Sequence, residues 1–219
     1  VVTGRMMLAA ARTRGVRYAL ALTGLVVVGQ FITYSFVSPV LHNRAGVELG
    51  DIGLMLLMYG IAGLIGNFAV APLLRRSPPL GVVIVVIGTA LSLVAVLLVM
   101  TDPTPTMLVM PMWGLFVGAI SVAMQAFIGS EASEVLEEGT ALNSAAFNTS
   151  IALGALIGGV ILDAAGQPPM ILTSVVMVGG GAVTARRLQR FLADGADVTI
   201  VAPELSDAVH DLVAGHDLT

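Results

Sequence analysis

Long apolar stretches without a charged side chain alternate with short polar connectors through most of the chain. The charge-free windows cover residues 18–43, 52–74, 77–101, 103–130, 139–162 and 164–185. Each window is long enough to cross a hydrocarbon layer of about 30 Å as a helix. The connectors between them carry the glycine and proline residues that favour turns. The pattern therefore predicts an all-α polytopic membrane protein with five to six transmembrane helices.

The window at 139–162 also predicts how such a helix packs. Gly154 and Gly158 are four residues apart, a spacing that lets a second helix backbone approach closely in lipid. Asn143 and Asn148 lie towards the other end of the same window. An amide in hydrocarbon is costly unless a partner helix or a water-filled cavity satisfies it. We expect one end of this helix to pack against protein and the other to line a wet cavity.

Composition and charge narrow the functional classes. Hydrophobic residues make up 57% of the chain, charged residues 11%, and the mean hydropathy is +0.96, which a soluble domain of this length does not show. The formal charge of −4 argues against a nucleic-acid partner. Without cysteine, and with only three scattered histidines, the sequence offers neither a metal site nor a catalytic residue.

Arginines predict the orientation in the membrane. Residues 1–17 form a leader with four arginines, and the apolar run that follows is about twice the length of a signal-peptide core, so we expect a retained helix rather than a signal peptide. Arg75 and Arg76 follow the second span. Because arginine-rich short loops stay in the cytoplasm, the N-terminus is predicted to be cytoplasmic in a multi-pass protein of the inner membrane. The chain begins with Val1, so we also expect it to be a piece of a longer protein.

Several stretches together resemble a known family. They are TYSFVSPVL at 33–41, YGIAGLIGNFAVAPLLRR at 59–76 and WGLFVGAISVAMQAF at 113–127. Residues 5–167 are similar to the C-terminal six-helix half of a major facilitator superfamily transporter, most of all to bacterial drug or sugar efflux permeases that exchange substrate for protons. The resemblance implies a non-enzymatic half-transporter at 18–167. Its partners would be the lipid bilayer, a small-molecule substrate and a missing N-terminal six-helix half.

The resemblance also implies particular residue roles. Gly66, Asn67, Arg75 and Arg76 resemble the cytoplasmic gating loop of the family, although Leu74 stands where an acid commonly precedes the arginine. In the efflux branch the proton-titrating acid generally lies in the N-terminal half, and this chain has no carboxylate in the middle of a span. On its own it is therefore not expected to transport.

Polar and aromatic residues share faces on four of the predicted helices, because residues four apart lie on one side of a helix. By the arrangement of the family, these four helices line the substrate cavity. The candidate cavity residues are Gln30, Tyr34, Tyr59, Trp113, Gln125, Asn143, Phe147 and Asn148. Packing between helices and anchoring at the membrane interface are the alternative roles for the aromatic residues.

Residues 168–219 have a different pattern. A β-branched run, a glycine triplet, an amphipathic stretch and the run VTIVA indicate the opening βαβ of a Rossmann-like fold. The sequence VGGGAVTARR followed by GADVTIVAPEL resembles the NAD-binding start of sirohaem synthase, the precorrin dehydrogenase, over residues 174–213. That resemblance implies NAD as a possible cofactor, approached by Gly179, Gly180, Gly181 and Glu204.

The same tail has a second interpretation, in which 164–185 is a sixth span that ends at Arg186 and Arg187. We favour the βαβ, which leaves five spans. The leading hypothesis is then an efflux-transporter fragment joined to the start of a sirohaem-synthase domain, by a real rearrangement or by misassembly of the gene sequence. The alternative is an NAD-binding oxidoreductase fragment of sirohaem biosynthesis fused to a membrane anchor. A homodimer of two half-transporters is the third hypothesis.

Overall fold

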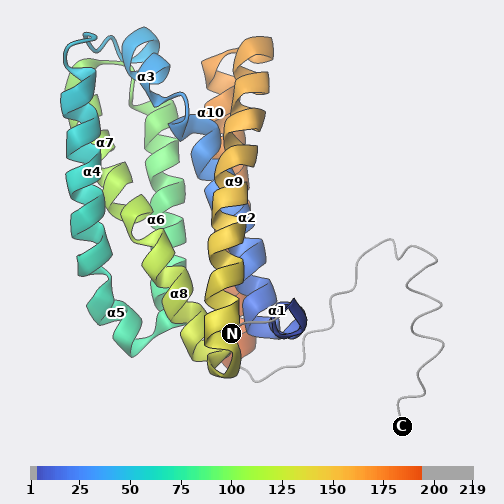
Figure 1. The fold of residues 1–219 in the computed structure, drawn as a ribbon. Helices are drawn as coiled ribbons and strands as arrows, with labels where there is room; N and C mark the ends of the chain where they lie inside the picture. Colours follow the sequence, from blue (N-terminus) through green and yellow to red (C-terminus); the bar gives the residue numbers. More distant parts are fainter. Residues whose placement is uncertain (1–3, 194–219) are drawn as a thin grey trace. The chain divides into compact units, whose positions relative to one another are not determined.

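The structure is a computed structural model that describes residues 4–193, and these residues are helical apart from short connectors. The described residues up to Gln189 form one compact unit, the helical bundle of Figure 1. In chain order the elements are α1 (Gly4–Arg12), α2 (Arg14–Tyr34), α3 (Val37–Pro39), the π-helix η1 (Val40–Arg44), α4 (Ile52–Ala69), α5 (Ala71–Arg76), α6 (Pro78–Leu98), α7 (Pro103–Gly118), α8 (Ile120–Glu131), the 3-10 turn η2 (Ser133–Val135), α9 (Leu136–Ala165) and α10 (Gln167–Ala193).

Six segments of this bundle are long and apolar enough to cross a membrane. They are Arg14–Tyr34, Ile52–Arg76, Pro78–Leu98, Pro103–Glu131, Ser133–Ala165 and Gln167–Arg187. Two of them are broken helices: α4 gives way to α5 just before Pro72, and α7 gives way to α8 at Ala119, after Gly118. Proline and glycine weaken the helical ladder at such points. The predicted all-α membrane fold is confirmed, and the described residues supply six candidate spans, the higher of the two predicted numbers.

The interpretation that we favoured for the tail is wrong at its first element. Residues 174–178 were expected to form a strand before a glycine turn, but they lie within the continuous helix α10. The expected domain boundary at residue 168 also falls at the start of this helix. The second predicted strand lies outside the described residues. The described part of the tail therefore follows the alternative interpretation, a sixth spanning helix.

Packing against α2 explains why this segment is helical. The buried residues Met170, Ser174, Val178 and Ala185 recur at helical spacing along one face of α10. They meet α2 in an antiparallel register: the hydroxyls of Thr33 and Ser174 lie 2.7 Å apart, Gly29 contacts Val178, and Gly181 faces Val26. A strand could not present this face, because successive side chains of a strand point to opposite sides.

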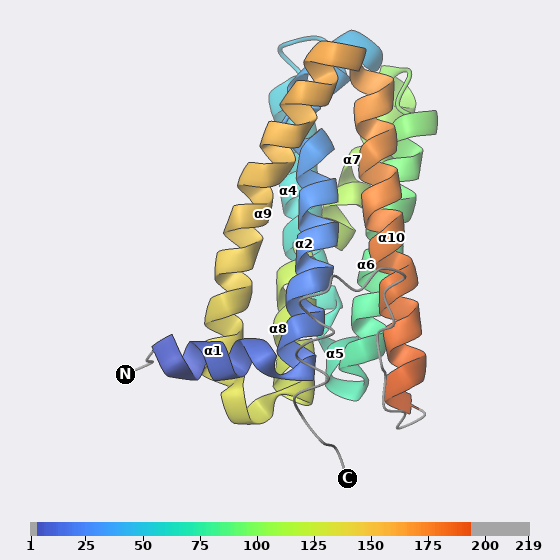
Figure 2. The ribbon, with the colours of Figure 1, turned by 90° about the vertical axis from the view of Figure 1, so that its right-hand side faces the viewer.

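Two pairs of helices organise the bundle, and glycines allow both to pack closely. Figure 2 shows α2 and α9, the first pair, side by side. In the first pair Gly154 of α9 lies against the backbone of Val28 in α2, and Gly158 lies against that of Ile32. In the second pair α4 and α7 meet through the backbones of Gly63 and Gly118. Each pair runs parallel and joins spans that are not consecutive in the chain. The pairing of span one with five and of span two with four is that of an inverted repeat of three helices.

Charges are divided between the two ends of the bundle. At the end where α2 and α9 begin, residues 4–187 place eight arginines against four glutamates. The arginines are Arg5, Arg12, Arg14, Arg17, Arg75, Arg76, Arg186 and Arg187, and the glutamates are Glu131, Glu134, Glu137 and Glu138. At the opposite end Arg44 is accompanied by Glu48, Asp51, Asp102 and Asp163. The end that carries α1 is therefore strongly positive relative to the other.

Candidate substrate site

Three side chains from three different helices form a hydrogen-bonded cluster inside the bundle. The indole Nε1 of Trp113 on α7 donates to Oε1 of Gln30 on α2 at 2.8 Å. The amide Nε2 of Gln30 donates to the hydroxyl of Tyr59 on α4 at 3.2 Å. Trp113 is 0% exposed, Gln30 1% and Tyr59 8%. The amide of Gln30 therefore has a donor on one side and an acceptor on the other, which is what a buried amide requires.

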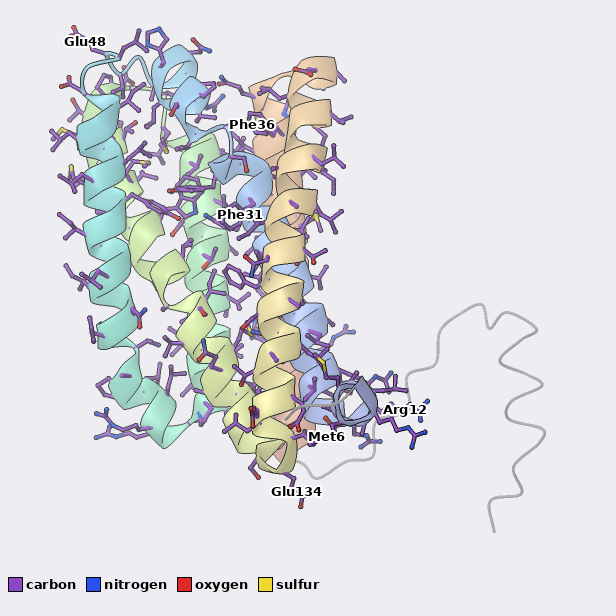
Figure 3. The ribbon with its side chains drawn as sticks, in the orientation of Figure 1. Met6, Arg12, Phe31, Phe36, Glu48 and Glu134 are labelled. Carbon is purple, nitrogen blue, oxygen red and sulfur yellow. The ribbon has the colours of Figure 1, made fainter. Side chains whose placement is uncertain are left out.

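Tyr34 extends this cluster with its ring. It stacks on Tyr59 with ring centroids 4.9 Å apart, and its edge meets Trp113 at 5.8 Å. Phe31, one of the side chains labelled in Figure 3, packs against Tyr34 edge-on at 5.7 Å. Tyr34 is only half-buried. The polar cluster is thus continued by an aromatic ring that is partly open to its surroundings.

Local sequence explains why Tyr59 and Trp113 meet. Gly114 follows Trp113 and lies directly on the backbone of Tyr59, a contact in which a side chain would collide with the Tyr59 carbonyl. The neighbouring contact between Gly63 and Gly118 lies one turn further along both helices. Because no Cβ separates the two backbones here, α4 and α7 come close enough for their aromatic side chains to share one layer. The glycines set the spacing and the aromatic rings occupy it.

The structure separates the other predicted cavity residues from this cluster. Asn143 on α9 is buried and accepts a hydrogen bond from Thr23 of α2 at 2.7 Å. Phe147 is half-buried one turn further along α9. Asn148 is exposed and donates to the carbonyl of Ser144 in its own helix at 2.8 Å.

Gln125 on α8 is also exposed, and it donates to the Ser121 hydroxyl at 3.2 Å. Thus Gln30, Tyr34, Tyr59 and Trp113 form one cluster, whereas the predicted residues of α8 and α9 lie elsewhere. Contacts between helices decide which residues belong to the cluster. The pattern of faces on each separate helix does not specify these contacts.

The residues of the predicted gating loop occupy the positive end of the bundle. Gly66 is buried with its Cα against the backbone of Leu115, while Asn67 is half-buried. Arg75 and Arg76 end α5 and are exposed. An apolar cavity of about 170 Å³ lies beside Gly66; it is lined by Gly66, Ala69, Val70, Leu73, Ile84, Val85, Leu115, Phe116 and Ala119.

The residues predicted to approach NAD lie in an unsuitable local structure or outside the described residues. Gly179, Gly180 and Gly181 form the interior of α10, where each backbone N–H is directed along the helix to an earlier carbonyl. A pyrophosphate is held by N–H groups that a helix start leaves unpaired, so the interior of α10 does not supply this site. Glu204 lies outside the residues that the structure describes.

Three polar residues that connect the helices were not predicted from the sequence: Thr23, Thr33 and Ser174. Thr23 pairs with Asn143, and Thr33 pairs with Ser174 across the contact between α2 and α10. All four side chains are buried. Their signal was available, since they are polar positions inside apolar spans, but threonine and serine can also bond to their own helix, as Thr89 does with the carbonyl of Val85 at 2.9 Å. Polarity alone therefore did not distinguish the interhelical pairs.

Comparison with protein families gives two matches that overlap. The family described as Major Facilitator Superfamily matches residues 19–194. A second family, described as Putative NAD(P)-binding, matches residues 172–217. Residues 172–194 belong to both matches, and they include the glycine triplet of α10. The first match covers all six candidate spans apart from the first turns of α2.

Individual relatives cover about three quarters of the chain. The uncharacterized MFS-type transporter YtbD of Bacillus subtilis is 32% identical in an alignment of 175 residues, and the alignment covers 74% of this chain and 42% of that protein. The transcription regulatory protein OpdE of Pseudomonas aeruginosa is 30% identical over 166 residues, 75% of this chain and 41% of OpdE. The purine ribonucleoside efflux pump NepI of Salmonella enteritidis is 26% identical over 162 residues, 74% and 41% of the two chains. The aligned part of this chain thus spans about two fifths of each of these relatives.

Proposed function

The chain belongs to the major facilitator superfamily, and from this premise we propose that it forms the C-terminal half of a transporter that exports small amphipathic molecules in exchange for protons. The observation that carries the proposal is the buried cluster of Gln30, Tyr59 and Trp113, extended by the half-buried ring of Tyr34. Binding sites for small molecules typically combine aromatic walls with a few polar groups that fix orientation.

The chemistry of the cluster favours a planar substrate with hydrogen-bonding edges. Tyr34 offers a ring face or edge for stacking, and Gln30 offers both an amide donor and an acceptor. One relative is named as a purine ribonucleoside efflux pump, and a purine has a flat ring with donors and acceptors on its rim. Purine ribonucleosides are therefore the first substrate class to test.

Binding would require the cluster to open. Gln30 already uses its amide on Trp113 and Tyr59, so a substrate that engages Gln30 replaces at least one of these hydrogen bonds. One such hydrogen bond contributes only about 1 kcal/mol net, so its exchange for a hydrogen bond to the substrate changes the free energy little. Such an exchange would allow α2 to separate from α4 and α7 when substrate binds, which fits the alternating access of this type of transporter.

The proton-coupling acid is proposed to lie in the N-terminal half of the assembled transporter. Spans Arg14–Tyr34, Ile52–Arg76 and Pro78–Leu98 hold no carboxylate. In spans Pro103–Glu131 and Ser133–Ala165 the acids stand in the first or last turns. Residues 164–187 contain none. This chain would then supply substrate contacts, and its partner half would supply the titrating group.

Fluorescence of Trp113 tests the substrate proposal directly, because it is the only tryptophan of the chain. Adenosine added to the purified full chain in detergent is expected to quench this fluorescence in a saturable manner. Gln30→Leu should abolish the quenching. Thr33→Val is the matched control, since it removes a buried hydroxyl from the same helix outside the cluster and should leave the quenching intact. Unsaturable quenching, or equal loss in both variants, would count against the site.

A second candidate function is binding of NAD by the tail, and the match to an NAD(P)-binding family over residues 172–217 favours it. In that case the fragment would belong to an oxidoreductase of sirohaem biosynthesis with a membrane anchor. Titration of the full chain with NADH, followed by nucleotide fluorescence, decides between the candidates. A saturable rise in emission supports the second candidate, and its absence at millimolar nucleotide rules this candidate out.

A further inference from the structure

The first helix, α1, lies outside the set of spanning helices. It has nine residues, so its length is about 14 Å, less than half of the hydrocarbon thickness. Figures 1 and 2 show it lying across the end of the bundle where α2 and α9 begin, and it contacts both helices. The direction of α1 is therefore that of a helix parallel to a membrane surface.

The turn between α1 and α2 is defined by one residue. Thr13 has an extended backbone, with φ −68° and ψ 141°, between two helical segments. Its N–H and its hydroxyl both donate to the carbonyl of Ala10, at 3.0 and 2.7 Å. These two bonds close the last turn of α1 and start α2 in a new direction. The crossing of the two helices is thus built into the local sequence.

The faces of α1 differ in chemistry. Ala10 is fully buried, and Met7 and Ala11 are half-buried, so this side rests on the bundle. Arg5 and Arg12, seven residues apart, share the exposed side, and Figure 3 shows Arg12 projecting away from the spanning helices. Between these sides the apolar side chains of Met6 and Leu8 are 45% and 57% exposed. A short helix with flanking exposed apolar residues and an arginine face has the pattern of an interfacial membrane helix.

The charge around α1 indicates which surface it meets. Arg17, at the start of α2, is exposed on the same end of the bundle as Arg5 and Arg12. The first acid in the sequence is Glu48, so residues 4–47 carry no negative charge of their own. The glutamates at this end belong to α8, η2 and α9. A cluster of arginines next to exposed apolar side chains is complementary to an anionic lipid surface, where headgroup phosphates lie above the acyl chains.

We propose that α1 is a lipid-binding helix that lies in the headgroup layer of the bilayer, with Arg5, Arg12 and Arg17 on anionic headgroups and with Met6 and Leu8 at the start of the acyl chains. This role is independent of the transported substrate and rests only on the membrane location of the bundle. It assigns a partner to a surface that the six spans leave uncovered.

The absence of cysteine allows a direct test on the full chain. Leu8→Cys carries an environment-sensitive fluorophore, and Ala9→Cys, an exposed position on the arginine side, is the matched control. Both labelled proteins are reconstituted into vesicles of phosphatidylcholine alone or with a quarter of phosphatidylglycerol. Lipid-borne and water-soluble quenchers are compared. At position 8 the lipid-borne quencher is expected to dominate in the anionic vesicles, and at position 9 the water-soluble one.

Charge removal tests the arginines. Arg5→Gln combined with Arg12→Gln should lower the ratio of lipid to aqueous quenching at position 8, about fivefold for each arginine lost. Arg186→Gln with Arg187→Gln removes equal charge at the same end of the bundle and should leave the ratio unchanged. Aqueous quenching at position 8 in both vesicle types would overturn the proposal. So would equal lipid quenching with and without the anionic lipid, or protection from both quenchers, which would show protein covering α1.

Discussion

The side chain of Gln30 joins three helices, because it forms one hydrogen bond to Tyr59 on α4 and another to Trp113 on α7. Its amide oxygen accepts a hydrogen bond from the Trp113 indole, and its amide nitrogen donates one to the Tyr59 hydroxyl. Each partner is buried, so loss of one bond leaves another group without a partner in an apolar surrounding. Groups of this kind typically cost about 1–3 kcal/mol when unsatisfied. The stability of the bundle is therefore linked to the groups proposed to bind substrate.

Tyr59→Phe tests this link. It removes the hydroxyl that accepts from Gln30 and keeps the ring that stacks on Tyr34. We expect the free energy of unfolding in detergent to fall by about 1–3 kcal/mol, because the amide N–H of Gln30 loses its acceptor. Thermal unfolding followed through Trp113 emission measures the change.

Tyr18→Phe provides the control for this variant, since Tyr18 is a half-buried tyrosine near the start of α2, away from the cluster. Its melting temperature should match that of the unaltered chain. A Tyr59→Phe variant that melts with the control would mean that the hydrogen bond to Gln30 contributes nothing to stability.

The sequence predicted the members of this cluster but not their association. Each member was selected as a candidate cavity residue because it lies on a polar or aromatic face of its own helix: Gln30, Tyr34, Tyr59 and Trp113. Gln125 was selected by the same reasoning; it lies exposed on α8, outside this cluster, and its role in a cavity stays a prediction. The difference arises from contacts between glycines of neighbouring helices, such as Gly63 with Gly118, which bring α4 and α7 together at one height. Helical periodicity within one segment contains no information about how that helix is aligned along its neighbour.

At the scale of elements, close glycine contacts hold the helix pairs together. A Cβ on Gly66 would overlap the carbonyl group of Leu115 on α7, whereas a Cβ on Gly60 of the same helix would meet nothing within 4 Å. Both residues lie in α4, so helix propensity is the same for a substitution at either position. Only the contact with α7 differs.

Gly66→Ala is therefore expected to force α4 and α7 apart and to lower stability by about 1–3 kcal/mol or more, the usual effect of overpacking. Gly60→Ala should be neutral or slightly stabilising, since alanine favours helix by about 1 kcal/mol over glycine. Size-exclusion profiles and melting temperatures of the two variants in detergent give the comparison. Equal stability would contradict the close packing of this pair.

The helix α10 was the element that the sequence misplaced. Its residues VVMVGGG combine β-branched side chains with glycines, which disfavour helix in water, and the local pattern resembled a strand and turn. The helical stripe of Met170, Ser174 and Val178 was present but is hard to see in a segment that is apolar on all sides. Contacts with α2, more than 130 residues away in the chain, decide the outcome.

Gly179 distinguishes the two interpretations of this segment. In α10 a Cβ at this position has nothing within 4 Å, so Gly179→Ala should keep or raise the melting temperature. Gly181→Val, on the same helix, should lower it, because even a Cβ there lies 3.0 Å from Val26. In a dinucleotide-binding turn the first glycine is required for the tight bend, so marked destabilisation by Gly179→Ala would contradict the helix.

For the whole molecule, six spans place both ends of the bundle's chain on one side of the membrane. The positive end, with α1, α5 and the start of α9, is expected in the cytoplasm because arginines there outnumber acids. The opposite end, with Asp102 in the connector between α6 and α7, is expected outside.

Single cysteines in the cysteine-free chain test this topology. In intact cells a membrane-impermeant maleimide should label Asp102→Cys, and it should label Glu134→Cys and Arg187→Cys only after permeabilisation. Arg187 is the informative position, since it follows α10. Labelling of Arg187→Cys from outside together with Asp102→Cys would mean that α10 does not cross, and five spans would remain.

The pairing of helices that are distant in sequence has a consequence for synthesis. The close partner of α2 is α9, and 101 residues separate the end of α2 from the start of α9. Likewise α4 is synthesised before its partner α7. During insertion Gln30 therefore enters the membrane before Tyr59 and Trp113 exist as partners. Until the later helices are made, the amide of Gln30 on α2 has neither of these partners. Membrane factors that shelter polar helices during translation would act on this chain at α2, and their removal should first reduce the yield of folded protein rather than its activity per molecule.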